Sequence, residues 1–214
     1  MMNAKCRIKY FNIEGVPGGS QEWCADFWMY LGGCAALAAC DQAICLARNY
    51  GFTDLYPYPA EDLKKQDYVD FGMIMKPYIH PRVNGVTRLS IFTKGFGKYL
   101  DKKGYEAEFE TCSGHEDYGT ALEFLKRGLD RNLPIAYLML RHKDPKFHDL
   151  NWHWFSVTGY REAGGRIRVQ YHTYGEKLEV DFEDLWKTGM YFRGGMISLK
   201  SIKKDCRKEN EKIR

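Results

Sequence analysis

Cys34 is the residue with the clearest capacity for chemistry, because its sequence position predicts a thiol at the start of a helix. It follows two glycines and is the first residue of a run, residues 34–47, that is apolar apart from two side chains. Such a run is typical of a helix packed through the middle of a domain. The first backbone N–H groups of a helix lack partners, and with the helix dipole they favour a thiolate over a thiol. The sequence therefore predicts a cysteine nucleophile.

The neighbouring residues allow two interpretations of Cys34. Gly32 and Gly33 permit close backbone approach, so a substrate could lie against them, and Gly33 is a candidate substrate-binding residue. The alternative is that Cys34 is a small buried hydrophobe, as we expect for Cys40 and Cys45 along the same helix. The cysteine alone does not distinguish these interpretations.

A second segment, residues 151–160, favours the catalytic interpretation. It is rich in aromatic and β-branched residues and predicts a strand with His153 near its start. His153, Phe155 and Val157 would share one face, so the imidazole would be held beside apolar neighbours. That setting suits a general base for a distant cysteine. The preceding Trp152 is a candidate substrate contact.

At these residues the chain resembles the papain-like cysteine peptidases, most closely the bacterial branch that includes bacteriocin-leader-processing peptidases. The resemblance covers roughly residues 20–200 and includes the stretch His153 to Tyr160, which ends Val-Thr-Gly-Tyr. It implies that Cys34 opens the central helix and that His153 is the base. It also implies a third residue, usually Asn or Asp, before a turn that matches residues 173–175, which places that role on His172.

A histidine at the third position departs from the family pattern. His172 can accept a hydrogen bond from His153 only while neutral, so it would orient the base at neutral or alkaline pH and repel it when both are protonated. It could instead mark a site that has lost full activity. Asp149, Asp181 and Asp184 are the nearby carboxylates, and strand alternation places Asp181 on a charged face instead.

The resemblance also implies an oxyanion hole made by the Cys34 backbone N–H and an upstream glutamine. Trp28 occupies the usual spacing, and Gln21 is the only upstream glutamine. Gln21 would reach the site if residues 23–30 form an inserted turn or short helix, and it is otherwise an exposed loop residue. Asp26 is nearer but would repel a developing negative charge.

The remaining pattern predicts an α+β fold of papain-like type, with an N-terminal helical layer, including the Cys34 helix, packed on a C-terminal antiparallel β-sheet. Helical spacing is found at residues 87–103 and 117–130. Strands are expected at 105–111, 134–140, 166–171, 177–180 and 195–199, with a helical turn at 182–186. The cleft would lie between the two layers, with the thiol on one wall and the imidazole on the other.

Residues 55–86 are broken by prolines and turn pairs. We expect an irregular connection packed by its aromatic side chains. If it runs beside the cleft, Tyr78 and His80 are candidate substrate contacts.

Composition is ordinary for one globular domain over residues 1–214, with a lead-in at 1–19 and a charged tail at 200–214. The net charge of +4 is spread along the chain, which argues against nucleic acid as a partner. Seven cysteines at irregular spacing without a Cys-x-x-Cys pair favour reduced thiols and no metal site. No signal segment or membrane span is apparent, so we expect a cytoplasmic location, no membrane partner and no cofactor. Oligomeric state is not indicated.

The expected activity is acyl transfer, in which Cys34 attacks an amide or thioester carbonyl and His153 carries the proton. With water as acceptor the protein is a peptidase or related amide hydrolase acting on a peptide or small amide, through a covalent acyl-enzyme. With an amine acceptor it is an acyltransferase or transpeptidase. A catalytically degenerate binding protein on the same fold is the other alternative.

Overall fold

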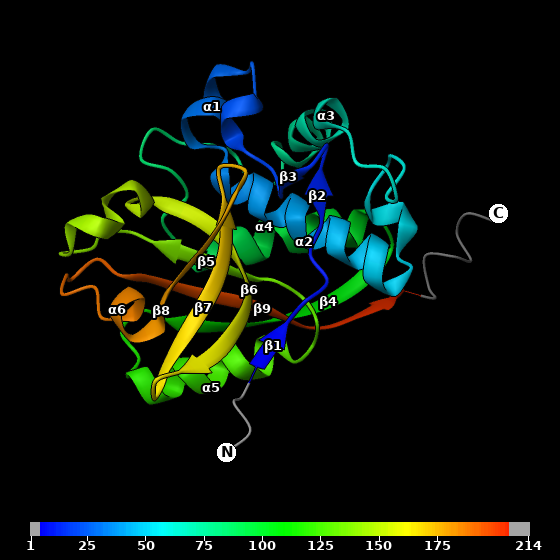
Figure 1. Ribbon diagram of the computed structural model, residues 1–214. Coiled ribbons are helices and arrows are strands. Elements are labelled where there is room, and N and C mark those ends of the chain that lie inside the picture. Colours follow the sequence, from blue (N-terminus) through cyan, green and yellow to red (C-terminus); the bar gives the residue numbers. More distant parts are fainter. Residues whose placement is uncertain (1–4, 206–214) are drawn as a thin grey trace, which may run out of the picture.

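The computed structural model describes residues 5–205 as helices packed on both faces of an antiparallel sheet (Figure 1). The helices are α1 (Phe27–Gly32), α2 (Cys34–Tyr50), α3 (Lys65–Met75), α4 (Leu89–Lys102), α5 (Tyr118–Leu129) and α6 (Phe182–Trp186), with short 3₁₀ helices η1 (Gln21–Trp23), η2 (Thr53–Leu55) and η3 (Pro145–Leu150). The strands are β1 (Lys5–Arg7), β2 (Asn12–Ile13), β3 (Val16–Pro17), β4 (Tyr105–Ser113), β5 (Ile135–Met139), β6 (His153–Ala163), β7 (Arg166–Thr173), β8 (Glu176–Asp181) and β9 (Gly194–Lys204).

The main sheet has the strand order β4-β9-β5-β6-β7-β8, and neighbouring strands run antiparallel. β1 adds to the edge of β6 beyond the end of β5, where Arg7 pairs with Gly159. β2 and β3 form a separate two-stranded hairpin. The expected mixed α+β fold with a large antiparallel sheet is therefore present.

Both faces of the sheet are covered, which explains why β5 is buried along its whole length. Ala136 and Leu138 point into a core shared with α2, α3 and α4. Ile135, Tyr137 and Met139 point into a second core shared with α5 and α6. The predicted division into an N-terminal helical layer and a C-terminal sheet is thus only partly correct, because helices from the second half cover the opposite face (Figure 1).

α2 forms where the apolar run predicts it and is the central helix of the first core. Residues 34–47 are all buried, so this helix lies inside the protein for most of its length. It ends where Gly51 adopts a left-handed conformation with φ 74°, which glycine does without steric cost. Its face toward the sheet contacts β6, so the expected Cys34 helix and His153 strand are neighbours.

Two regions differ from the expectation. Residues 55–86 contain α3, whose buried positions Tyr68, Phe71, Gly72 and Met75 have helical spacing. The start of the expected tail is not a helix or a frayed end, because β9 continues through Lys204 alongside β4. The rest of that expected tail, and the first four residues of the lead-in, lie outside the described residues. No described helix is long and apolar enough to cross a membrane.

Candidate active site

Cys34 is the first residue of α2, directly after Gly33, and only 6% of its surface is exposed. Burial raises the pKa of its thiol to about 11, although backbone hydrogen bonds from Trp154, Ala35 and Cys34 itself act in the opposite direction. The helix start therefore has the expected effect, but desolvation outweighs it. With its pKa raised in this way, the thiol is protonated at neutral pH.

His153 is the first residue of β6 and is 4% exposed. Its Nε2 lies 2.6 Å from Thr173 Oγ1 at the end of β7. Burial lowers the pKa of His153 to about 4, so the imidazole is neutral at physiological pH. Within residues 5–205 no hydrogen bond joins this ring to Cys34, so the two groups form a neutral pair and not an ion pair.

Tyr174 covers one face of the His153 ring. The two rings are stacked with centroids 4.6 Å apart and planes 8° from parallel, and the Tyr174 hydroxyl lies 3.3 Å from Nδ1. Because the planes are nearly parallel, this hydroxyl sits over the ring face and leaves the in-plane lone pair of Nδ1 open. Burial is the main cause that raises the pKa of Tyr174 to about 12, with further contributions from Cys34, Glu22 and Asp149.

Cys34 and His153 share the walls of two adjoining hollows, together with Gln21 and Tyr174. The inner cavity, about 30 Å³, extends along α2 to Asp41. The outer cavity, about 210 Å³, opens at Gly32, residues 83–85 and Trp152. Residues far apart in the sequence therefore converge on one concave site with a thiol, an imidazole and an amide on its walls.

Gln21 reaches this site because the chain folds into η1 and α1 between it and Cys34, as the sequence analysis required. Its Nε2 donates to the Tyr30 carbonyl at 3.1 Å. Its Oε1 is buried and accepts no hydrogen bond from the described residues. Buried amide oxygens are nearly always paired, so an unpaired one in a cavity wall indicates a place for a ligand or water.

His172 does not take the expected role. The described hydrogen bond to the His153 ring from β7 comes from Thr173, the next residue, because adjacent strand residues diverge and only this hydroxyl reaches Nε2. The His172 ring instead packs on Tyr10, with centroids 4.3 Å apart, and its Nε2 lies 3.4 Å from Gln170 Nε2. Burial lowers its pKa to about 4, so this ring is also neutral.

The alternative carboxylates lie elsewhere. Asp181 caps α6 and pairs with Arg166, and Asp184 pairs with Lys146 and Arg166. Asp149 is an exposed residue of η3. None of the three makes a described hydrogen bond with the imidazole of His153.

Of the four substrate-contact candidates, the exposed His80 lines neither hollow, and the other three have different outcomes. Trp152 lines the outer cavity, is 39% exposed and has the left-handed φ of 58°. Gly33 is packed against Met29, with no room for a Cβ, and its neighbour Gly32 lines the outer cavity in its place. Tyr78 packs edge-on against Tyr99 and lines neither hollow, so the structure removes it from the site.

Thr173 and Tyr174 were not singled out as site residues by the sequence, although both lie in the turn that follows His172. The available signal was the hydroxyl of Thr173, which directly follows His172, the residue expected to orient the base. Within residues 5–205 no three His, Cys, Asp or Glu side chains are grouped to hold a metal ion, and the six described cysteines are free thiols.

No protein-family model matches the chain, and no curated protein matches it. Among solved structures, the chain is similar to one described as the crystal structure of UfSP from C. elegans. The TM-score is 0.43 and the sequence identity is 9%, over 96% of this chain and 35% of that chain. This chain thus spans about a third of the length of that protein. We infer the function of this chain from its own residues.

Proposed function

We propose that this protein is a cysteine-dependent amide hydrolase, most specifically a peptidase, with Cys34 as nucleophile and His153 as base. The observation that carries the proposal is the convergence of the α2 thiol, the β6 imidazole and the Gln21 amide on one cavity. Thiol, base and amide donor are the groups that acyl transfer through a covalent intermediate requires.

The neutral pair determines how the reaction would begin. Since the thiol is protonated and the imidazole is neutral, His153 acts as a general base while Cys34 attacks, and no thiolate is present beforehand. The Sγ proton moves to Nδ1 as the Sγ–C bond forms, and the protonated ring then gives it to the leaving amine. Water, deprotonated by the same ring, hydrolyses the thioester and restores the thiol.

Thr173 is a positioning residue in this mechanism. In the tautomer in which its hydroxyl accepts from Nε2–H, Nδ1 is the basic nitrogen. A hydroxyl can also donate, so it selects the tautomer less strictly than an amide or carboxylate oxygen does. We therefore assign to Thr173 the role that the sequence analysis gave to His172.

The oxyanion would be held by the Cys34 backbone N–H and the Gln21 side chain. One N–H of the Gln21 amide is engaged by Tyr30, and the amide has a second N–H to donate. A donor of this kind contributes about a hundredfold or more to the rate in comparable sites. The assignment rests on Gln21 lining both cavities with Cys34.

A non-catalytic binding protein is the second candidate function. It is favoured by one observation, the 6% exposure of Cys34 together with its raised pKa. An acyltransferase would use the same residues as the peptidase, and the two differ only in whether water or an amine accepts the acyl group.

The test is cleavage of a diverse peptide library, with products identified by mass spectrometry. Cys34→Ser and His153→Ala should each lower the cleavage rate by about a thousandfold or more. Cys112→Ala is the matched control, because Cys112 is equally buried but lies on β4 in the second core, and its rate should be unchanged.

A peptide aldehyde supplies an independent readout, since it forms a thiohemiacetal with a functional Cys34. Cleavage that persists in Cys34→Ser would overturn the proposal. Absence of both cleavage and aldehyde labelling, with tight peptide binding retained, would establish the binding-protein alternative.

A further inference from the structure

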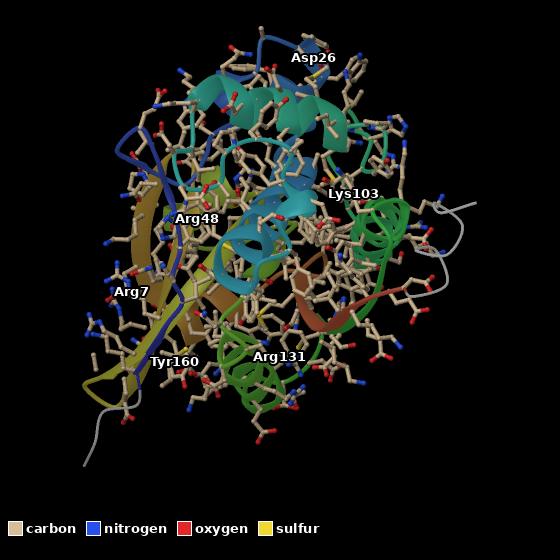
Figure 2. All side chains as sticks on the ribbon, turned by 90° about the vertical axis from the view of Figure 1, so that its right-hand side faces the viewer. Arg7, Asp26, Arg48, Lys103, Arg131 and Tyr160 are labelled. Atoms are coloured by element: carbon tan, nitrogen blue, oxygen red, sulfur yellow. The ribbon has the colours of Figure 1, made fainter. Side chains whose placement is uncertain are left out.

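A second concave surface lies outside the candidate active site, where β1, β6, β7 and β8 run side by side. We call it the basic groove. It has a volume of about 320 Å³ and is lined by Lys5, Cys6, Arg7, Gly159, Tyr160, Arg161, Arg168, Gln170, Lys177, Leu178 and Glu179. Figure 2 shows two of its members, Arg7 and Tyr160, on β1 and β6 at the same side of the molecule.

The hollow exists because Gly159 has no side chain. It pairs with Arg7 on one side and with Gln170 on the other. A Cβ at Gly159 would lie 2.8 Å from the Cys6 carbonyl oxygen, so a side chain at this position would push β1 away from β6. The same missing side chain leaves the floor of the groove open between flanking cationic residues.

The charge in the groove is strongly unbalanced. Its lining includes five cationic side chains and one carboxylate, Glu179. Arg161 and Arg168 both pair with Glu179, at 2.5 and 3.4 Å. Within the described part of the chain, Lys5, Arg7 and Lys177 have no ion-pair partner. The groove therefore has an excess of four positive charges, as large as the net charge of the whole sequence.

The groove adjoins the inner cavity of the candidate active site through two side chains. Gln170 lies in the groove and its amide nitrogen is 3.4 Å from the ring of His172, which lines the inner cavity. The charges of Lys177 and Arg7 also act on His172, since they contribute to lowering its pKa. A ligand chain in the groove would therefore lie next to the cavity that contains Cys34.

We propose that the basic groove binds an acidic segment of a polypeptide. Like-charged side chains in a concave surface raise the local concentration of anionic ligands and are complementary to several carboxylates. The 38% exposed Leu178 and the half-buried Tyr160 ring supply apolar contacts that a peptide can use. β8 is the last strand in the order of the sheet, an edge position at which extended peptides can add to a sheet.

The assignment of this segment to the substrate rests on the proposed peptidase function, whereas binding itself does not. We therefore place the binding experiment on the Cys34→Ala protein. A fluorescent peptide with a run of glutamates should bind with an affinity that falls as salt is added. A peptide with glutamines in place of the glutamates should bind at least about tenfold more weakly, a difference of about 1.4 kcal/mol.

Charge reversal locates the binding site. Lys177→Glu should weaken binding of the glutamate peptide about tenfold. Adding Arg7→Glu to Lys177→Glu should weaken the binding further. Lys94→Glu on α4 changes the net charge equally and should have less than about a twofold effect, which separates the groove from the general charge of the protein. Equal effects of Lys94→Glu and Lys177→Glu, or no saturable binding, would overturn the proposal.

Two further comparisons settle the ligand class and its relation to catalysis. A single-stranded oligonucleotide of equal charge that binds more tightly than the peptide would overturn the choice of a polypeptide. With wild-type protein, an acidic segment attached to a cleaved peptide should lower KM, and Lys177→Glu should abolish that advantage with kcat unchanged. Groove binding without this KM effect would support the groove and overturn its assignment to the substrate.

Discussion

Two polar regions lie two turns apart on α2, and both face β6, but their hydrogen bonding differs. At Asp41 the carboxylate accepts from three hydroxyls, those of Tyr10, Tyr68 and Ser156, at 2.7 to 2.9 Å. At Cys34 the surrounding polar groups are not all paired, since Gln21 Oε1 has no described partner and no described hydrogen bond joins His153 to the thiol.

The difference indicates which region is structural and which is available for chemistry. Asp41 is buried, and burial raises its pKa, while the three hydroxyls partly offset that effect. A fully satisfied polar cluster of this kind holds helix and sheet in register. The Cys34 region instead leaves donor and acceptor capacity open in a cavity, as a site that must accept a ligand does.

The largest expected effect on stability is at Asp41. Asp41→Ala should lower the free energy of unfolding by about 3 to 5 kcal/mol, because it leaves three hydroxyls without their acceptor, two of them buried. Asp41→Asn keeps one acceptor oxygen and should cost less. Urea denaturation measures both. A loss below about 1 kcal/mol for Asp41→Ala would show that the cluster is not structural.

A pH series tests the other region through His153. Its pKa is about 4 when folded and 6.5 when exposed, so the unfolded chain binds a proton first as pH falls. This contribution to stability is complete above pH 6.5 and is lost as pH falls toward 4, by on the order of 3 kcal/mol.

The direct measurement is the NMR titration of the His153 ring, with the exposed His115 as an internal comparison. A midpoint near 4 is expected for His153. A midpoint well above 7 would mean that the ring is protonated at neutral pH, and the neutral-pair mechanism would then fail.

The smallest expected effect is at Thr173. Thr173→Val removes one hydrogen bond to His153 and should lower kcat about tenfold, with KM and the unfolding midpoint little changed. Thr173→Ser keeps the hydroxyl and should restore the rate. Equal rates for the valine and serine variants would exclude a positioning role. The hydrogen bond of Thr173 would then be structural, as those of Asp41 are.

Particular residues show how far sequence reasoning extends. The α2 helix was predicted because residues 34–47 are apolar on nearly all sides, and the β6 strand because its segment is rich in aromatic and β-branched residues. α3 was missed although its buried residues have helical spacing, because the prolines and turn pairs around it dominated the interpretation. β1 is three residues long, and its pairing with β6 depends on contacts more than 150 residues away in sequence.

The sequence by itself determined that a thiol begins a helix, that a histidine begins a strand, and that an upstream glutamine precedes both. Only the tertiary structure decided that Thr173 and not His172 contacts His153, that Gly32 and not Gly33 lines the cavity, and that the thiol is protonated. Local patterns specify elements, since helix and strand periods are short-range. Hydrogen-bond partners and desolvation depend on distances through space, which exist only once the layers have packed.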